Sequence, residues 1–135
     1  MKRLLGLISL VLLAGCSQGH SYQYFVTHPN MTREKLMQCQ TNGYNNNPNN
    51  ECITANQAWE RIRDLILEAS SDQLAFGNKI MHTQIELAKA KEALANSQGG
   101  VTNTQKHVDL KTKITALEND IAQYLAIIGL SEPTQ

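Results

Sequence analysis

Apolar residues recur at alternating steps of three and four through residues 55–98, which is the spacing of one face of an α-helix. No proline interrupts this stretch, and Gly77 is its only glycine. A capping box formed by Thr54 and Gln57 marks a helix start. The pattern therefore predicts one helix of about 45 residues, about 68 Å long. Its stripe consists of Trp59, Ile62, Ile66, Ala69, Gln73, Phe76, Ile80, Thr83, Leu87, Ala90 and Leu94.

A second apolar stripe follows the pair Gly99-Gly100 and predicts a second helix. A capping box of Thr102 and Gln105 precedes the stripe, and Gly129 stands where a helix C-terminal glycine is common. This helix is expected to have about 26 residues and a length of about 39 Å. Its stripe consists of Leu110, Ile114, Leu117, Ile121, Tyr124 and Ile128.

Two helices joined by a short turn are antiparallel neighbours. Folding the chain at residues 99–100 places Ile121 near Ile80 and Ile114 near Leu87, so that the two stripes meet at coiled-coil spacing. The returning helix is expected to end near Gln73, which leaves the first turns of the long helix uncovered. A shorter helix predicted at 29–39 is long enough to lie on that end.

The first sixteen residues have the layout of a secretory signal. Lys2 and Arg3 precede an apolar run at 4–13, which is shorter than the roughly 20 residues that a membrane-spanning helix needs. The end of the run, Leu13-Ala14-Gly15-Cys16, resembles the bacterial lipoprotein cleavage box. That resemblance implies a signal peptide at 1–15, lipidation of Cys16 and a membrane-anchored mature protein. The small polar stretch that follows predicts a tether at 16–23.

The net charge and the residue after Cys16 both bear on where the mature protein is located. The signal holds two of the twelve basic residues and no acidic one, which leaves ten basic against twelve acidic residues. Such a chain has no long-range attraction to nucleic acid. By resemblance to sorted lipoproteins, Ser17 after the cysteine favours the outer membrane. The expected location is the cell envelope, with the lipid as the membrane contact.

Two further cysteines, Cys39 and Cys52, bracket an asparagine-rich stretch and raise three possibilities: a metal site, a redox pair or a disulfide. Their separation of thirteen positions does not match the Cys-x-x-Cys spacing of thioredoxin-like sites. Structural zinc takes four ligands, and no paired histidine spacing accompanies the cysteines. Cysteine pairs in exported proteins persist as disulfides. An intramolecular disulfide is therefore predicted, with a contribution to stability of about 3 kcal/mol.

Together these patterns predict an all-α fold. We expect a long antiparallel, coiled-coil-like hairpin at 59–130, a short N-terminal helix stapled by the disulfide, and a tail at 131–135. Because such a hairpin buries little surface, self-association or a partner protein along it is expected.

Enzymatic residues are not evident in the sequence. The four histidines are scattered, and no nucleophile lies in a recognisable arrangement with a base. We expect a protein that is not an enzyme and has no cofactor. Trp59 is interpreted as core filler or as a partner-binding anchor, because tryptophan is enriched at interface hot spots. Tyr44, in the asparagine-rich loop, is the other candidate for a partner surface.

The segment 24–58 contains a series of features in a fixed order. They are Tyr24-Phe25, His28-Pro29, Arg33 with Lys35, Cys39, the loop through Pro48, Cys52, and Ala55 with Ala58. In these features the segment resembles the EexN-type entry exclusion lipoproteins of conjugative type IV secretion systems. The resemblance implies non-catalytic contact with incoming transfer machinery, which blocks redundant transfer of an element the cell already carries. The alternative is a structural lipoprotein of the envelope or of a secretion apparatus, with the coiled coil as its interaction module.

Overall fold

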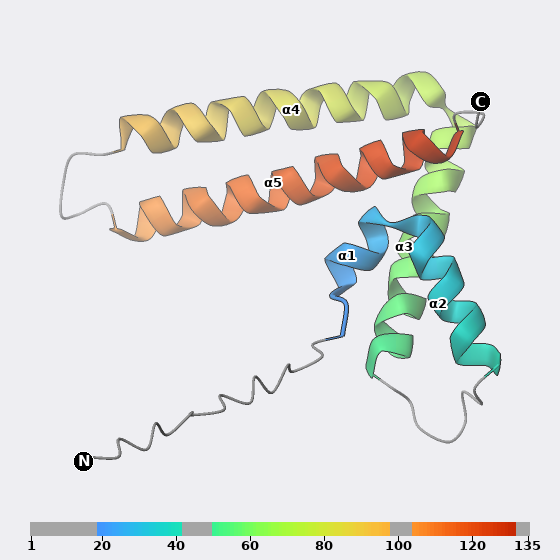
Figure 1. Cartoon of the computed structure of the whole chain (residues 1–135). Helices are drawn as coiled ribbons and strands as arrows, with labels where there is room; N and C mark the ends of the chain where they lie inside the picture. Colours follow the sequence, from blue (N-terminus) through green and yellow to red (C-terminus); the bar gives the residue numbers. More distant parts are fainter. Residues whose placement is uncertain (1–18, 42–49, 98–103, 132–135) are drawn as a thin grey trace, which may run out of the picture.

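The computed structural model describes residues 19–41, 50–97 and 104–131. Every element in these ranges is a helix, which confirms the all-α prediction (Figure 1). The elements are α1 (Tyr22–Thr27), α2 (Pro29–Thr41), α3 (Asn50–Ser71), α4 (Gln73–Asn96) and α5 (Thr104–Ser131). The predicted signal at 1–15, Cys16, Tyr44, the Gly99-Gly100 turn, Thr102 and most of the tail at 131–135 lie outside the described residues.

Helices α4 and α5 form the predicted antiparallel hairpin, with their axes side by side over most of their length (Figure 1). The Phe76 and Tyr124 rings meet edge to face with centroids 5.6 Å apart. Further along, Nζ of Lys113 lies 3.4 Å from Oε2 of Glu86. Both contacts fit a fold of the chain near residue 100, so the predicted hairpin is confirmed. Near its end the predicted stripe is wrong, because Ile127 is 4% exposed and Ile128 is 39% exposed.

The prediction of one continuous helix over 55–98 is wrong, because the chain breaks at Asp72. This residue has an extended backbone (φ −151°, ψ 91°), and its side chain accepts a hydrogen bond from the Ala75 backbone N–H at 2.9 Å. It is therefore the N-cap of α4. Just before it, the Ser70 and Ser71 hydroxyls donate to carbonyls of the preceding turn, an arrangement that competes with regular helix. We call this break the elbow; beyond it α4 runs at a steep angle to α3 (Figure 1).

Helices α1, α2 and α3 pack together into a unit that we call the cap. Its core is fully enclosed: Phe25, Val26, Ala55, Ala58, Ile62 and Leu65. The buried face of α3 differs from the predicted stripe, because Leu65 is 0% exposed whereas Ile66 is 38% exposed. The predicted stripe requires α3 and α4 to form one continuous helix with a single buried face. The break at the elbow allows each helix to bury a different face. Gln73, a predicted seam position, is likewise exposed at the start of α4.

Three predicted boundaries also need correction. Helix α1 begins at Tyr22, inside the predicted tether 16–23, because the Ser21 hydroxyl caps it by accepting from the Tyr24 backbone N–H at 3.2 Å. Helix α3 begins at Asn50, so Thr54 lies inside the helix and is not its cap. Helix α5 continues through Gly129 to Ser131, so that glycine does not end it.

Polar side chains join the cap to the hairpin. The Gln123 amide donates to Oε1 of Gln23 in α1 at 3.2 Å, and its carbonyl oxygen accepts from Nε of Arg61 in α3 at 3.3 Å. The Gln23 amide in turn donates to the Asn119 carbonyl at 3.3 Å. Gln123 is only 7% exposed. Because these partners come from three helices, the network fixes where α5 crosses the cap.

Candidate functional site

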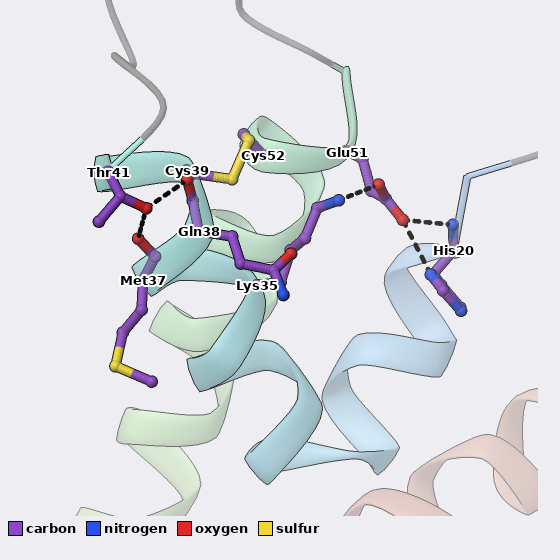
Figure 2. Close-up of a disulfide and its surroundings, with 8 residues drawn as sticks. All are labelled: His20, Lys35, Met37, Gln38, Cys39, Thr41, Glu51 and Cys52. Atoms are coloured by element: carbon purple, nitrogen blue, oxygen red, sulfur yellow. Dashed lines mark hydrogen bonds and ion pairs between the residues drawn. A yellow bond between two sulfur atoms is a disulfide. The ribbon is translucent and has the colours of Figure 1, made fainter.

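A disulfide joins the last turns of α2 to the first turn of α3, as the sequence predicted (Figure 2). The Cα atoms of Cys39 and Cys52 are 6.0 Å apart, and the Cys39 side chain faces the interior at 5% exposure. Within the described residues, both cysteines take part in this bond. It closes the asparagine-rich stretch into a loop and holds α2 against α3.

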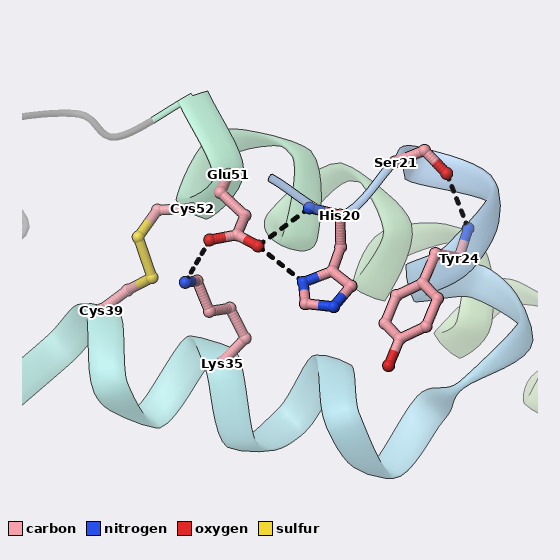
Figure 3. A network of polar contacts seen from close by, with 7 residues as sticks. All are labelled: His20, Ser21, Tyr24, Lys35, Cys39, Glu51 and Cys52. Atoms are coloured by element: carbon pink, nitrogen blue, oxygen red, sulfur yellow. Dashed lines mark hydrogen bonds and ion pairs between the residues drawn. A yellow bond between two sulfur atoms is a disulfide. The ribbon is translucent and has the colours of Figure 1, made fainter. Parts of the chain in front are cut away.

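Glu51, immediately before Cys52, is the polar centre of the same region (Figure 3). Its Oε2 accepts a hydrogen bond from the Lys35 ammonium group. Its Oε1 accepts from the His20 backbone N–H at 3.0 Å and lies 2.8 Å from Nδ1 of the same histidine. The Glu51 side chain is 15% exposed, Lys35 is 23% exposed and His20 is 51% exposed. One shielded carboxylate therefore holds two segments that are distant in sequence.

The same contacts stabilise the ionised form of Glu51. The hydrogen bond from Lys35, followed by those from His20, lowers the pKa of Glu51 from its ordinary value of 4.5 to about 2. Its place in the first turn of α3 acts in the same direction, because a helix N-terminus favours negative charge. The carboxylate is thus charged at neutral pH.

We call His20, Lys35, Cys39, Glu51 and Cys52 the clasp. They bring three segments to the first turn of α3: the chain before α1, the middle and end of α2, and α3 itself (Figures 2 and 3). A shallow hollow of about 200 Å³ lies beside them. Within the described ranges, no group of three or more His, Cys, Asp or Glu side chains is placed to hold a metal ion. The arrangement is suited to fixing the position of the chain.

Aromatic rings extend the clasp along α1. The His20 ring stacks on Tyr24 with centroids 4.2 Å apart, and Tyr24 stacks on His28 at 4.3 Å. Nδ1 of His28 lies 2.8 Å from the Tyr24 carbonyl oxygen. The stack gives His20 a second support besides Glu51, so the chain that leads into α1 is held on two sides.

A second hollow lies at the elbow, where α3, α4 and the end of α5 meet. Its volume is about 410 Å³, and its wall is mainly apolar. We call it the elbow groove; the lining includes Ile66, Ala69, Phe76, Gly77, Ile127 and Ile128. Nearby on α3 and α4, Leu67 is 60% exposed and Leu74 is 77% exposed. The groove can accept an apolar side chain from outside.

Trp59 packs partly buried against the cap core. This placement agrees with the interpretation as core filler, and its role as a partner anchor stays a prediction. The structure does not bring Trp59 into the elbow groove, whose lining comes from later residues.

The sequence did not reveal Glu51 or the elbow groove. An acidic residue beside a cysteine signals a helix start only if the helix begins there, and the expected start was Thr54. The groove depends on the break at Asp72, which apolar periodicity does not detect. The Ser-Ser-Asp triplet before Gln73 was the available signal, because Asp and Ser favour N-caps over helix interiors.

Comparisons with family models, with curated proteins and with solved structures give no match to this chain. The likeness of segment 24–58 to entry exclusion lipoproteins therefore stays a hypothesis. Among the helices that the structure describes, none is both long and apolar enough to cross a membrane.

Proposed function

We propose that this protein is a lipid-anchored envelope protein that acts in entry exclusion, by non-catalytic contact with the conjugative transfer machinery. One observation supports this most directly. In the described part of the segment that resembles the EexN-type lipoproteins, α1, α2 and the start of α3 pack on the cap core, and the two cysteines of the motif are paired. The spacing of the motif thus has a physical reason.

The proposal assigns different tasks to the two halves. The lipid on Cys16 anchors the chain, and the cap follows it within a few residues. The hairpin and the elbow groove present surface to a protein partner, and the exposed apolar side chains Leu67 and Leu74 lie at the elbow. Partner-binding surfaces are typically apolar at their centre with a polar rim. Exclusion by contact requires no catalytic group.

A mating assay tests the proposal. Recipients that lack the gene should receive the matching conjugative element more often than recipients that carry it. A Leu74→Asp variant should weaken exclusion, because it places a charge beside the elbow groove. Val108→Asp, at an exposed apolar site near the start of α5 and away from the elbow, is the matched control. Unchanged transfer frequency after deletion of the gene would remove the exclusion hypothesis.

A structural role in the envelope or in a secretion apparatus is the second candidate, and the dimensions of the hairpin favour it. Helices α4 and α5 contain 24 and 28 residues, which correspond to arms of about 36 and 42 Å. Arms of this length suit a spacer. If this role is the correct one, deletion should impair secretion or envelope integrity in donor cells while recipients exclude nothing.

A further inference from the structure

We infer that the clasp end of the cap is the surface that rests on the lipid headgroups, with the elbow groove held at the opposite end of α3. The inference rests on the lipidation of Cys16 that the proposed function includes. It adds which part of the folded protein the lipid bilayer contacts.

The described chain begins beside the clasp. A Cβ placed on Gly19 would lie 3.5 Å from Cδ of Glu51, so this residue lies beside the clasp. The next residue, His20, is bonded to Glu51 through both its backbone N–H and its ring (Figure 3). The chain therefore leaves the folded protein at the first turn of α3.

The chain between this point and the lipid is short. Three residue steps separate Cys16 from Gly19, and a fully extended chain of that length spans at most about 11 Å. A lipid attached to Cys16 keeps its acyl chains in the bilayer. Gly19 must therefore stay within about 11 Å of Cys16, and because Gly19 lies beside Glu51, the first turn of α3 stays close to the headgroups.

The elbow groove lies far from the clasp along α3. Ile66, which lines the elbow groove, is fifteen residues beyond Glu51 on the same helix, or about 22 Å along its axis. The clasp end also carries its own exposed apolar side chains: Met37, near the end of α2, is 53% exposed, and Ile53, in the first turn of α3, is 40% exposed. These side chains suit contact with the interfacial region of a bilayer. The elbow groove then faces away from the bilayer that anchors the protein.

The chain contains a single tryptophan, which allows a direct test. In a Trp59→Phe background, Met37→Trp places a fluorophore at the clasp end and Leu74→Trp places one at the elbow. Full-length lipidated protein is incorporated into phosphatidylethanolamine and phosphatidylglycerol vesicles that contain a headgroup nitroxide quencher. We expect strong quenching of the tryptophan at position 37 and little quenching at position 74. Equal quenching at both positions, or stronger quenching at position 74, overturns the inference.

A Glu51→Ala variant tests whether the clasp sets this placement. Without the carboxylate, His20 keeps only its ring stacking on Tyr24, and the first residue held by a hydrogen bond becomes Ser21, the N-cap of α1. The tether then lengthens from three residue steps to as many as five. Quenching at position 37 should fall, while Glu118→Ala on the hairpin should leave it unchanged. If Glu51→Ala leaves quenching at position 37 unchanged, the clasp does not set the placement.

Mass analysis of the N-terminal peptide separates the failure of this inference from the failure of the proposed function. If Cys16 carries no lipid, the anchoring part of the proposed function fails and the placement fails with it. If Cys16 is lipidated and the quenching pattern is reversed, only the placement is wrong. If a bound protein covers the tryptophan at position 37 and keeps the quencher away from it, the clasp end is a protein interface. That result also overturns the inference.

Discussion

The cap and the hairpin are built from similar lengths of helix, but they are stabilised differently. In the cap, six side chains from α1 and α3 are no more than 1% exposed, and a disulfide joins α2 to α3. In the hairpin, beyond the core cluster that includes Phe76 and Ile80, the buried hydrophobic residues among those described are Ala90 and Ile114, at 4% and 9% exposure. The cap has a core, whereas the hairpin has a seam between two helices.

The ion pairs follow the same division. Glu51 in the cap is shielded and has three hydrogen-bonded contacts from two residues. The hairpin pair Lys91 and Glu118, at 2.7 Å, joins side chains that are 53% and 49% exposed. Because water screens exposed charges, such pairs contribute little. The best-buried part of the hairpin is therefore its elbow end, where Phe76 of α4 packs on Tyr124 of α5 in the same cluster as the cap core.

The largest expected effect comes from the same substitution, isoleucine to alanine, made once in the cap and once in the hairpin. Ile62→Ala in the cap should lower the free energy of unfolding by about 4 kcal/mol, whereas Ile114→Ala in the hairpin should lower it by about 2 kcal/mol, because Ile114 lies beside solvent and its site can relax. Urea unfolding followed by Trp59 fluorescence and by far-UV circular dichroism measures both. Equal losses in the two variants would contradict the contrast between core and seam.

Removal of the disulfide should be nearly as costly, but only for the cap. A Cys39→Ser, Cys52→Ser double variant should lose about 3 kcal/mol of stability, since the loop that the bond closes gains freedom in the unfolded chain. Hydrogen exchange should show faster exchange in α2 and unchanged exchange in α4 and α5. Faster exchange throughout the hairpin would mean that the two regions unfold together. Mass spectrometry that finds both thiols free in the mature wild-type protein would remove the basis of this prediction.

Acid should weaken the cap through Glu51. Its pKa is lowered from 4.5 to about 2 in the folded protein, so its contribution is present above pH 4.5 and is lost as the pH falls toward 2. The full shift corresponds to at most about 3 kcal/mol, and solvent around the half-exposed His20 reduces that value. Urea unfolding at a series of pH values measures it. Glu51→Gln should flatten this part of the pH dependence, and an identical profile in wild type and variant would show that other carboxylates are responsible.

The sequence predicted the helical class, the hairpin and the disulfide, because each follows from apolar periodicity, a glycine pair or cysteine usage. It did not predict the elbow, since Gln73 continues the three-and-four spacing while Asp72 has an extended backbone and a side chain that caps α4. It placed Ile66 in the core instead of Leu65 for the same reason. The contact between Glu51 and His20 joins residues 31 positions apart, and one-dimensional patterns contain no information on such a pair.

The smallest expected effect concerns the exposed ion pair of the hairpin. Lys91→Ala removes its contact with Glu118, and alanine has a slightly higher helix propensity than lysine. The two effects oppose each other, so the free energy of unfolding should change by less than about 0.5 kcal/mol. Lys35→Ala, which removes the shielded partner of Glu51 in the cap, is the matched comparison and should cost about 1.5–3 kcal/mol, as expected for a hydrogen bond to a charged group. Urea unfolding of the two variants in low and high salt completes the test, because salt screens the exposed pair much more than the shielded one. A larger loss for Lys91→Ala than for Lys35→Ala would show that the hairpin is stabilised by its surface charges rather than by its buried side chains.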